Sequence, residues 1–204
     1  MAVVFASLFL CFVAYPIAFQ DLRHWSPGIG GLSFTGIGIG TLSIIPLEPL
    51  SRKLINRHRL DPTTGKPPPE AMASIVCIAA VSLATGQLWF AWTCTPNTHW
   101  LVPILAGIPF GLGSAGVITY ANNYLAQAYG IYAASALAGN NILRSVAGAG
   151  LTLAGPRMYA ELGLHWGSTV LGVVEVVCVG IPVVFWLCGN RLRKRSAICQ
   201  AQQT

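Results

Sequence analysis

Charged residues are scarce in this sequence. Only 9% of its 204 residues are Asp, Glu, Lys or Arg, whereas a soluble globular domain carries about 25%. The sequence is 54% hydrophobic, and its mean hydropathy is +0.62. This composition excludes an ordinary soluble domain and places the chain among integral membrane proteins.

The sequence also lacks the motifs of metal, cofactor and catalytic sites. Its six cysteines form no CxxC pair, and most lie in or at the ends of apolar runs, which argues against a disulfide framework or a metal site. There is no Ser-His-Asp set, no pair of catalytic carboxylates, no phosphate-binding loop and no zinc-ligand spacing. We therefore expect no enzyme activity, no catalytic or metal-binding residues and no cofactor.

Long apolar runs are what the sequence does contain. A membrane-spanning helix needs about 20 mostly apolar residues, and tryptophans typical of the membrane interface flank several of the runs. No basic segment precedes the first run, so we interpret it as a span and not as a signal peptide. The sequence predicts an all-α membrane protein with six transmembrane helices, approximately Ala2–Phe19, Gly28–Pro46, Met72–Thr93, Trp100–Asn122, Tyr132–Ala154 and Trp166–Cys188.

The positions of the basic residues predict the orientation. Nine of the twelve Lys and Arg residues lie after the second and the sixth runs, and two lie in the connections on the opposite side. Since cytoplasmic connections are enriched in Lys and Arg, both termini are predicted to be cytoplasmic. The net charge of +6 is thus a topology signal and not a nucleic-acid patch. We divide the chain into helices one and two (1–50), a cytoplasmic loop (51–71), helices three to six (72–190) and a basic cytoplasmic tail (191–204).

Small residues recur at four-residue spacing in three of the runs. Such stripes let helix backbones approach closely in lipid, where packing drives association. We expect them to be packing surfaces, or alternatively sliding surfaces in a protein that moves. The stripes are Gly36 with Gly40, Gly107 with Gly111 and Ala115, and Ser135 with Gly139.

Arg144 is a permanent charge within the fifth apolar run. It lies about twelve residues into the run, near mid-membrane at about 1.5 Å per residue, so it must face protein or water and not lipid. Its candidate acidic partner is Glu175 in the sixth run. The amides of Asn140 and Asn141 satisfy the guanidinium or line a substrate path. A structural role, as an ion pair or an arginine capped by backbone carbonyls, and a role in ligand binding or proton coupling remain equal alternatives.

Aromatic and amide side chains in the third and fourth runs suggest a pocket for bulky apolar compounds. Tyr120 shares a helix face with Tyr124, Asn123 lies close to it, and Gln87 lies in the third run. The nearby tryptophans of the third run are more simply membrane-interface anchors. The candidate residues of a substrate path are therefore Arg144, Asn140, Asn141, Glu175, Tyr120, Asn123 and Gln87.

Several motifs, in order along the chain, resemble one known family. "GLSFTGIGIG", "DPTTGKPPPEAM", "LWFAWTCTPNTHW", "ILAGIPFGLG", "GNRLRKRS" and above all "GIYAASALAGNNILRSVAGAGLTLAGPRMYAELG" resemble helices seven to twelve of fungal drug:proton antiporters of the major facilitator superfamily. The last motif resembles their eleventh-helix signature. The chain departs from the family pattern at Gln127, where many members carry an acidic residue.

The resemblance implies a function in transport. It implies half of a twelve-helix carrier that exports drugs or secondary metabolites in exchange for protons, by alternating access between two halves. The expected partners are the lipid bilayer, a small organic substrate and protons, with a homodimer or a separate N-terminal half completing the pathway and no nucleic acid. The expected location is the plasma membrane. The alternative is a truncated, non-transporting relic or a regulatory half that needs a separate N-terminal half.

Overall fold

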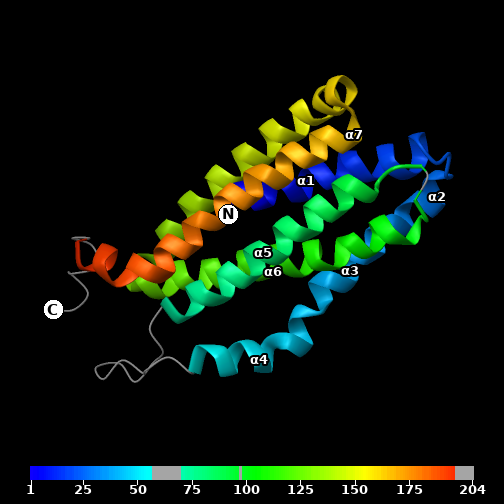
Figure 1. The fold of residues 1–204 in the computed structure, drawn as a ribbon. Coiled ribbons are helices and arrows are strands. Elements are labelled where there is room, and N and C mark those ends of the chain that lie inside the picture. Colours follow the sequence, from blue (N-terminus) through cyan, green and yellow to red (C-terminus); the bar gives the residue numbers. More distant parts are fainter. Residues whose placement is uncertain (57–69, 97, 196–204) are drawn as a thin grey trace.

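A computed structural model of the chain describes residues 1–56, 70–96 and 98–195, and within these ranges the backbone is helical with no strand (Figure 1). The long helices lie side by side in one bundle, except for α4, which diverges from it. The elements are α1 (Ala2–Pro16), the π-helix η1 (Ile17–Asp21), α2 (Pro27–Gly30), the 3₁₀-helix η2 (Gly31–Phe34), α3 (Thr35–Leu42), α4 (Ile44–Asn56), α5 (Glu70–Thr93), α6 (Leu101–Tyr129), the 3₁₀-helix η3 (Gly130–Tyr132) and α7 (Ala133–Arg195).

Helix α7 consists of two arms that meet at Gly163. This residue has φ 77° and ψ 161°, a left-handed conformation that glycine adopts without steric cost, and Figure 1 shows the helix doubling back. We call residues 133–162 the first arm and residues 164–195 the second arm. We expected residues 155–165 to form a loop between the fifth and sixth spans, and this prediction was wrong. The helix continues through Arg157, which pairs with Glu161 one turn later at 4.0 Å.

Four segments of the described residues are long and apolar enough to cross a membrane: Ala2–Asp21, Gly28–Ile55, Met72–Thr93 and Leu101–Val184. The last contains 84 residues, although about 20 suffice for one crossing. The positive φ angles of Gly130 and Gly163 divide it into three stretches. The fold is therefore an all-α membrane protein, as the composition predicts.

The second predicted span is not one continuous helix. It begins as α2 and η2, continues as α3 and breaks at Ser43, after which α4 leaves the bundle (Figure 1). The hydroxyls of Thr41 and Ser43 donate to the carbonyl oxygens of Ile37 and Ile39 at 2.9 and 2.7 Å, and such hydrogen bonds to the preceding turn bend helices. Residues 51–56 of the predicted loop continue α4, while its residues 57–69 lie outside the described residues.

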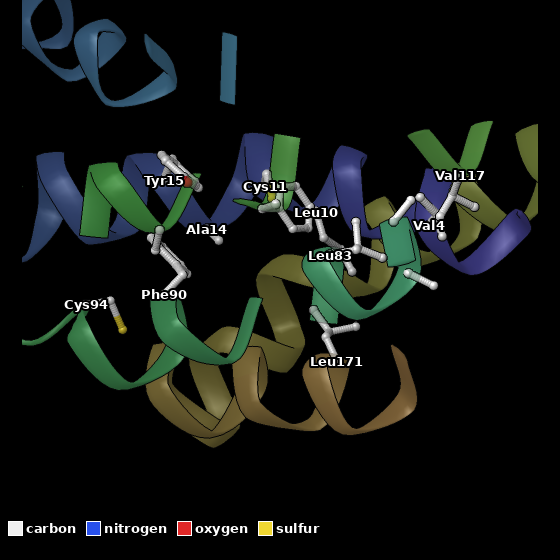
Figure 2. Close-up of a cluster of buried hydrophobic side chains, with 14 of the residues drawn as sticks. Val4, Leu10, Cys11, Ala14, Tyr15, Leu83, Phe90, Cys94, Val117 and Leu171 are labelled. Atoms are coloured by element: carbon white, nitrogen blue, oxygen red, sulfur yellow. The ribbon is translucent and has the colours of Figure 1, made fainter. Parts of the chain in front are cut away.

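A buried apolar cluster joins α1, α5, α6 and α7 (Figure 2). Tyr15 of α1 stacks on Phe90 of α5 with the ring planes nearly parallel and the centroids 4.7 Å apart. Leu83 of α5, Val117 of α6 and Leu171 of the second arm complete the contacts among the four helices. Burial of apolar side chains in this cluster fixes the positions of the helices around α1.

Two glycine stripes bring α3 and α6 into backbone contact. A Cβ atom added to Gly36 would lie 2.0 Å from the carbonyl oxygen of Ile104, and one added to Gly40 would lie 2.1 Å from that of Ile108. On the α6 side, a Cβ added to Gly111 would lie 2.3 Å from a carbonyl oxygen of α3. The predicted packing role of these stripes is therefore confirmed, because only glycine permits this approach.

The turn after η1, the connection between α5 and α6 and the turn of α7 lie near one another at one end of the bundle. Arg23, after η1, donates hydrogen bonds to the carbonyl oxygen of Thr95 at 2.9 Å and to the hydroxyl of Thr98 at 3.2 Å. Nδ1 of His165, just after the turn of α7, lies 2.7 Å from the carbonyl oxygen of Ala91. These contacts join the turn after η1 to the connection between α5 and α6, and the turn of α7 to the end of α5.

The same end carries tryptophans predicted as interface anchors. The rings of Trp25 and Trp100 lie 5.9 Å apart between centroids, and Trp166 is exposed beside the turn of α7. Burial raises the pKa of the nearby Cys94 thiol to about 11, so this thiol stays protonated at neutral pH. This end of the bundle therefore combines packed aromatics with polar ties between the turns.

Candidate functional site

A cavity of about 590 Å³ lies between α1, α5, α6 and the two arms of α7. Most of its wall is aliphatic, as in sites for drug-sized organic molecules. Among the described residues that line it, Glu175 alone has a carboxylate or basic side chain. The wall comprises residues 1–4 of α1 and the chain start, Ala73, Val76, Ala80 and Leu83 of α5, Val117, Ala121, Tyr124, Leu125, Ala128 and Tyr129 of α6, and Asn140, Leu143, Glu175, Cys178, Val179, Ile181 and Pro182 of α7.

Glu175, on the second arm, is the chemically exceptional residue of this wall. It is only 2% exposed. Ser7 of α1 lies beside its carboxyl group, but neither carboxyl oxygen has a hydrogen-bond partner of ordinary geometry within the described residues. A buried carboxylate without a partner loses its hydration uncompensated, so this group is poised to take a proton or to meet a positive charge that enters the cavity.

Asn140 contributes the amide of the wall. Its Nδ2 lies 3.1 Å from Sδ of Met1 and 3.5 Å from Oδ1 of Asn122 on α6. These contacts hold the start of the first arm against α6 and the beginning of α1. The predicted alternative that Asn140 lines a path agrees with this placement, while Asn141 is exposed on the outer side.

The predicted pairing of Arg144 with Glu175 is wrong. Instead, Cζ of Arg144 lies 4.7 Å from the centroid of the Phe5 ring on α1, a cation–π geometry. The reason is depth: Arg144 precedes Gly163 by 19 residues and Glu175 follows it by 12. Because the arms turn at Gly163, the difference of seven residues separates the two groups by about 10 Å along the bundle.

Tyr120 and Tyr124 were predicted to share a face, but they contact different surroundings. Tyr124 lines the cavity. Tyr120 is 4% exposed, and its hydroxyl donates a hydrogen bond to Oε2 of Glu48 at 2.7 Å. Oε1 of Glu48 accepts a hydrogen bond from Nε of Arg52 at 3.0 Å. Tyr120 therefore fastens α4 to α6 and does not line the cavity.

The two remaining predicted residues also lie off the cavity wall. Gln87 is 4% exposed and lies where α5 meets the second arm, since a Cβ added to Gly172 would be 3.6 Å from its Cγ. Asn123 is exposed. The structure thus brings Asn140 and Glu175 to one wall and distributes the other predicted residues around it.

Two features of the site are absent from the sequence prediction. The first is that residues 1–4 line the cavity. Their uncharged, small to medium side chains were the sole indication in the sequence that this end of the first run contacts other helices. The second is the contact between Glu48 and Tyr120, which are 72 residues apart. No spacing rule connects such distant residues.

The chain matches fungal efflux pumps over 96% of its length. It is 41% identical over 195 residues to the MFS-type efflux pump MFS2 of Trichophyton rubrum, covering 33% of that protein. It is 41% identical to the major facilitator superfamily multidrug transporter mdrA of Aspergillus fumigatus, covering 32%. It is 36% identical to the ascochitine biosynthesis cluster MFS transporter of Didymella fabae, covering 38%.

No protein-family model matches the chain, and no solved structure matches it. The curated relatives are named as transporters or efflux pumps and not as enzymes. The chain has helices suited to crossing a membrane. Its similarity to the relatives extends over almost all of this chain but over only about a third of each relative. The sequence is similar to fungal efflux pumps of the major facilitator superfamily over almost its entire length and spans about one third of the length of the curated relatives it matches.

Proposed function

We propose that this chain forms one half of a membrane carrier that exports small organic molecules such as drugs or secondary metabolites. The observation that carries the proposal is the cavity of about 590 Å³, mostly apolar and with one buried carboxylate, in a chain related to efflux pumps. Alternating access in exchange for protons is the proposed mechanism, with the cavity closed from the other side by a second half.

In the proposed topology the carrier lies in the plasma membrane, and this chain crosses it six times. Both termini of the chain then lie in the cytoplasm. The contacts of Arg23 and His165 support it, because they gather three turns at one end. The basic residues of the loop 51–71 and of the tail 191–204 support cytoplasmic placement of the opposite end. Helices one and two (1–50) and helices three to six (72–190) then form one bundle.

The second half is proposed to pack on the exposed side of the first arm of α7. Leu153 is 84% exposed and Ile142 is 68% exposed, and Asn141 of the same arm is also exposed. A separate N-terminal half, or a second copy in parallel orientation, would cover such a surface. The chain's coverage of only about a third of its relatives supports the need for one of them.

Complementation in a yeast strain without its own multidrug pumps tests this function. The chain is expressed alone and together with the N-terminal part of the Trichophyton rubrum pump, and the accumulation of a fluorescent substrate is measured. We expect co-expression to lower accumulation and a protonophore to abolish the difference. Unchanged accumulation, with both pieces present at the cell surface in equal amounts, would contradict export.

The alternative function is a non-transporting or regulatory half. The same exposed side of the first arm favours it, since this surface would bind a carrier half without completing a pathway. Co-purification with the N-terminal part, combined with no change in substrate accumulation, is the result expected for this alternative. Transport by the chain alone, accompanied by a cross-linked homodimer, would contradict it.

A further inference from the structure

Glu175 is the starting point for an inference about the charge of the substrate. The residue is 2% exposed, lies on the cavity wall and has no hydrogen-bond partner for either carboxyl oxygen within the described residues. An ionised group in such a place is costly unless an opposite charge meets it. The cavity therefore contains one uncompensated acidic position.

Three arginines among the described residues contact groups other than Glu175. Arg144 lies over the ring of Phe5, and the ion pairs found there, Arg52 with Glu48 and Arg157 with Glu161, do not involve Glu175. The α-amino group of Met1 is also in the wall region, but burial lowers its pKa below the ordinary value, which weakens its hold on a proton. Within the described residues, none of these groups supplies Glu175 with a countercharge.

The rest of the cavity defines the shape and polarity of that ligand. The wall beside Glu175 is built mainly from aliphatic side chains such as Val76, Leu83 and Val179, which favour an apolar body. The volume of about 590 Å³ accepts a compound of drug size. A molecule with a large hydrocarbon surface and a single positive charge satisfies both parts of the site.

We propose that this cavity takes lipophilic organic monocations and that the Glu175 carboxylate selects their charge. The proposal rests on the proposed export function for its physiological meaning, but binding itself requires no transport. Glu175 acts here as a specificity-determining group within the wall. Asn140, on the first arm, also lines the cavity and contacts Met1 and Asn122.

The test is binding of tetraphenylphosphonium to the purified chain in detergent, with tetraphenylborate as an anion of the same shape. Glu175→Gln removes the charge with little change in size, and Glu175→Asp retains it. The matched control is Glu161→Gln, which removes an exposed carboxylate from the same helix. Circular dichroism and size-exclusion chromatography establish that each variant is folded.

We expect Glu175→Gln to weaken tetraphenylphosphonium binding by about tenfold or more, equivalent to about 1.4 kcal/mol, and to leave tetraphenylborate binding equal or stronger. Glu175→Asp retains cation binding, and Glu161→Gln changes neither probe. Equal affinity of the wild-type chain and folded Glu175→Gln for the cation would overturn the proposal, as would loss of both probes together.

The two proposals fail in distinguishable ways. If binding is charge-selective but the complementation experiment shows no export, the proposed function fails and the assignment of Glu175 stands. If co-expressed halves export cationic and neutral dyes at equal rates with Glu175→Gln, the assignment fails and export stands. If Glu175 serves only as a protonation site, the Glu175→Gln variant keeps its affinity for tetraphenylphosphonium, and the assignment fails.

Discussion

The interface of α3 with α6 and the first arm of α7 carry the same sequence pattern but differ in packing. Gly36 and Gly40 lie against carbonyl oxygens of α6, with no room for a Cβ atom. Gly139, in the stripe with Ser135, has nothing within 4 Å of the position that its Cβ would occupy. One stripe is a completed contact and the other is an unoccupied surface of the described chain.

The difference shows what a stripe of small residues specifies. It permits a close approach of two helices, but another helix must be present at that face for the approach to occur. In α3 that helix is α6, which runs parallel with it, since Gly36 meets Ile104 and Gly40 meets Ile108. In the first arm, the corresponding partner is proposed to come from a second half.

Gly40→Ala is expected to give the largest effect on the fold. Its Cβ would lie 2.1 Å from the carbonyl oxygen of Ile108, so α3 and α6 must separate. Overpacking of this kind costs about 1–3 kcal/mol, and the melting temperature of the detergent-solubilised chain should fall. Gly38→Ala is the matched control on the same helix, because nothing lies within 4 Å of that position. Equal melting temperatures for the two variants would refute the close contact.

The contact of the first arm with α1 is expected to contribute less. Replacing Arg144 by Met and Phe5 by Leu removes the cation–π pair from either side. A double-mutant cycle on thermal stability should give a coupling of about 0.5–2 kcal/mol. A coupling near zero would mean that the guanidinium only rests on the ring. Glu175→Gln in the same background tests the earlier pairing, and we expect it to be additive with Arg144→Met.

The attachment of α4 is expected to be weaker still. Tyr120→Phe removes the hydroxyl that donates to Glu48, a loss of about 1 kcal/mol because one side of the contact is open to solvent. Hydrogen exchange of the amides of α4 should accelerate while that of α5 and α6 stays unchanged. Tyr132→Phe, at an exposed ring, serves as control. Uniform acceleration in all three helices would indicate global destabilisation and not release of α4.

The smallest effect on the chain alone is expected for Gly139→Ala. Its Cβ meets open space, so the free energy of unfolding should change by no more than about 0.5 kcal/mol, and the melting temperature should stay nearly the same. Bulkier Gly139→Leu should reduce co-purification with the N-terminal part of a related pump if that part packs on this stripe. Undiminished co-purification would place the second half on another face.

Sequence patterns anticipated the lengths of the helices better than their rotations. Hydropathy follows the chain along the membrane normal, so runs such as Met72–Thr93 coincide closely with α5. It does not fix which direction a side chain takes around the helix axis. Nor does it fix where the turn between two helices lies. Arg144 was predicted correctly as a charge that faces protein, but the turn at Gly163 places it at a different depth from Glu175, and its neighbour is Phe5.

Breaks in the helices were harder to predict for a similar reason. The stop at Ser43 depends on hydroxyl groups that bond to the preceding turn, a geometry that many serines in helices do not adopt. The turn at Gly163 depends on the choice of one glycine among the 22 in the chain. For the candidate site, Glu175 and Asn140 were identified from polarity in apolar runs, whereas the cavity that joins them arises from the packing of four helices.

The turn at Gly163 also bears on how this part of the chain enters a membrane during synthesis. A single residue with a positive φ angle joins the two arms of α7, so no extended loop separates them. We therefore expect the arms to enter a membrane together as a helical hairpin. A side chain at Gly163 would thus disturb membrane insertion before any tertiary contact has formed.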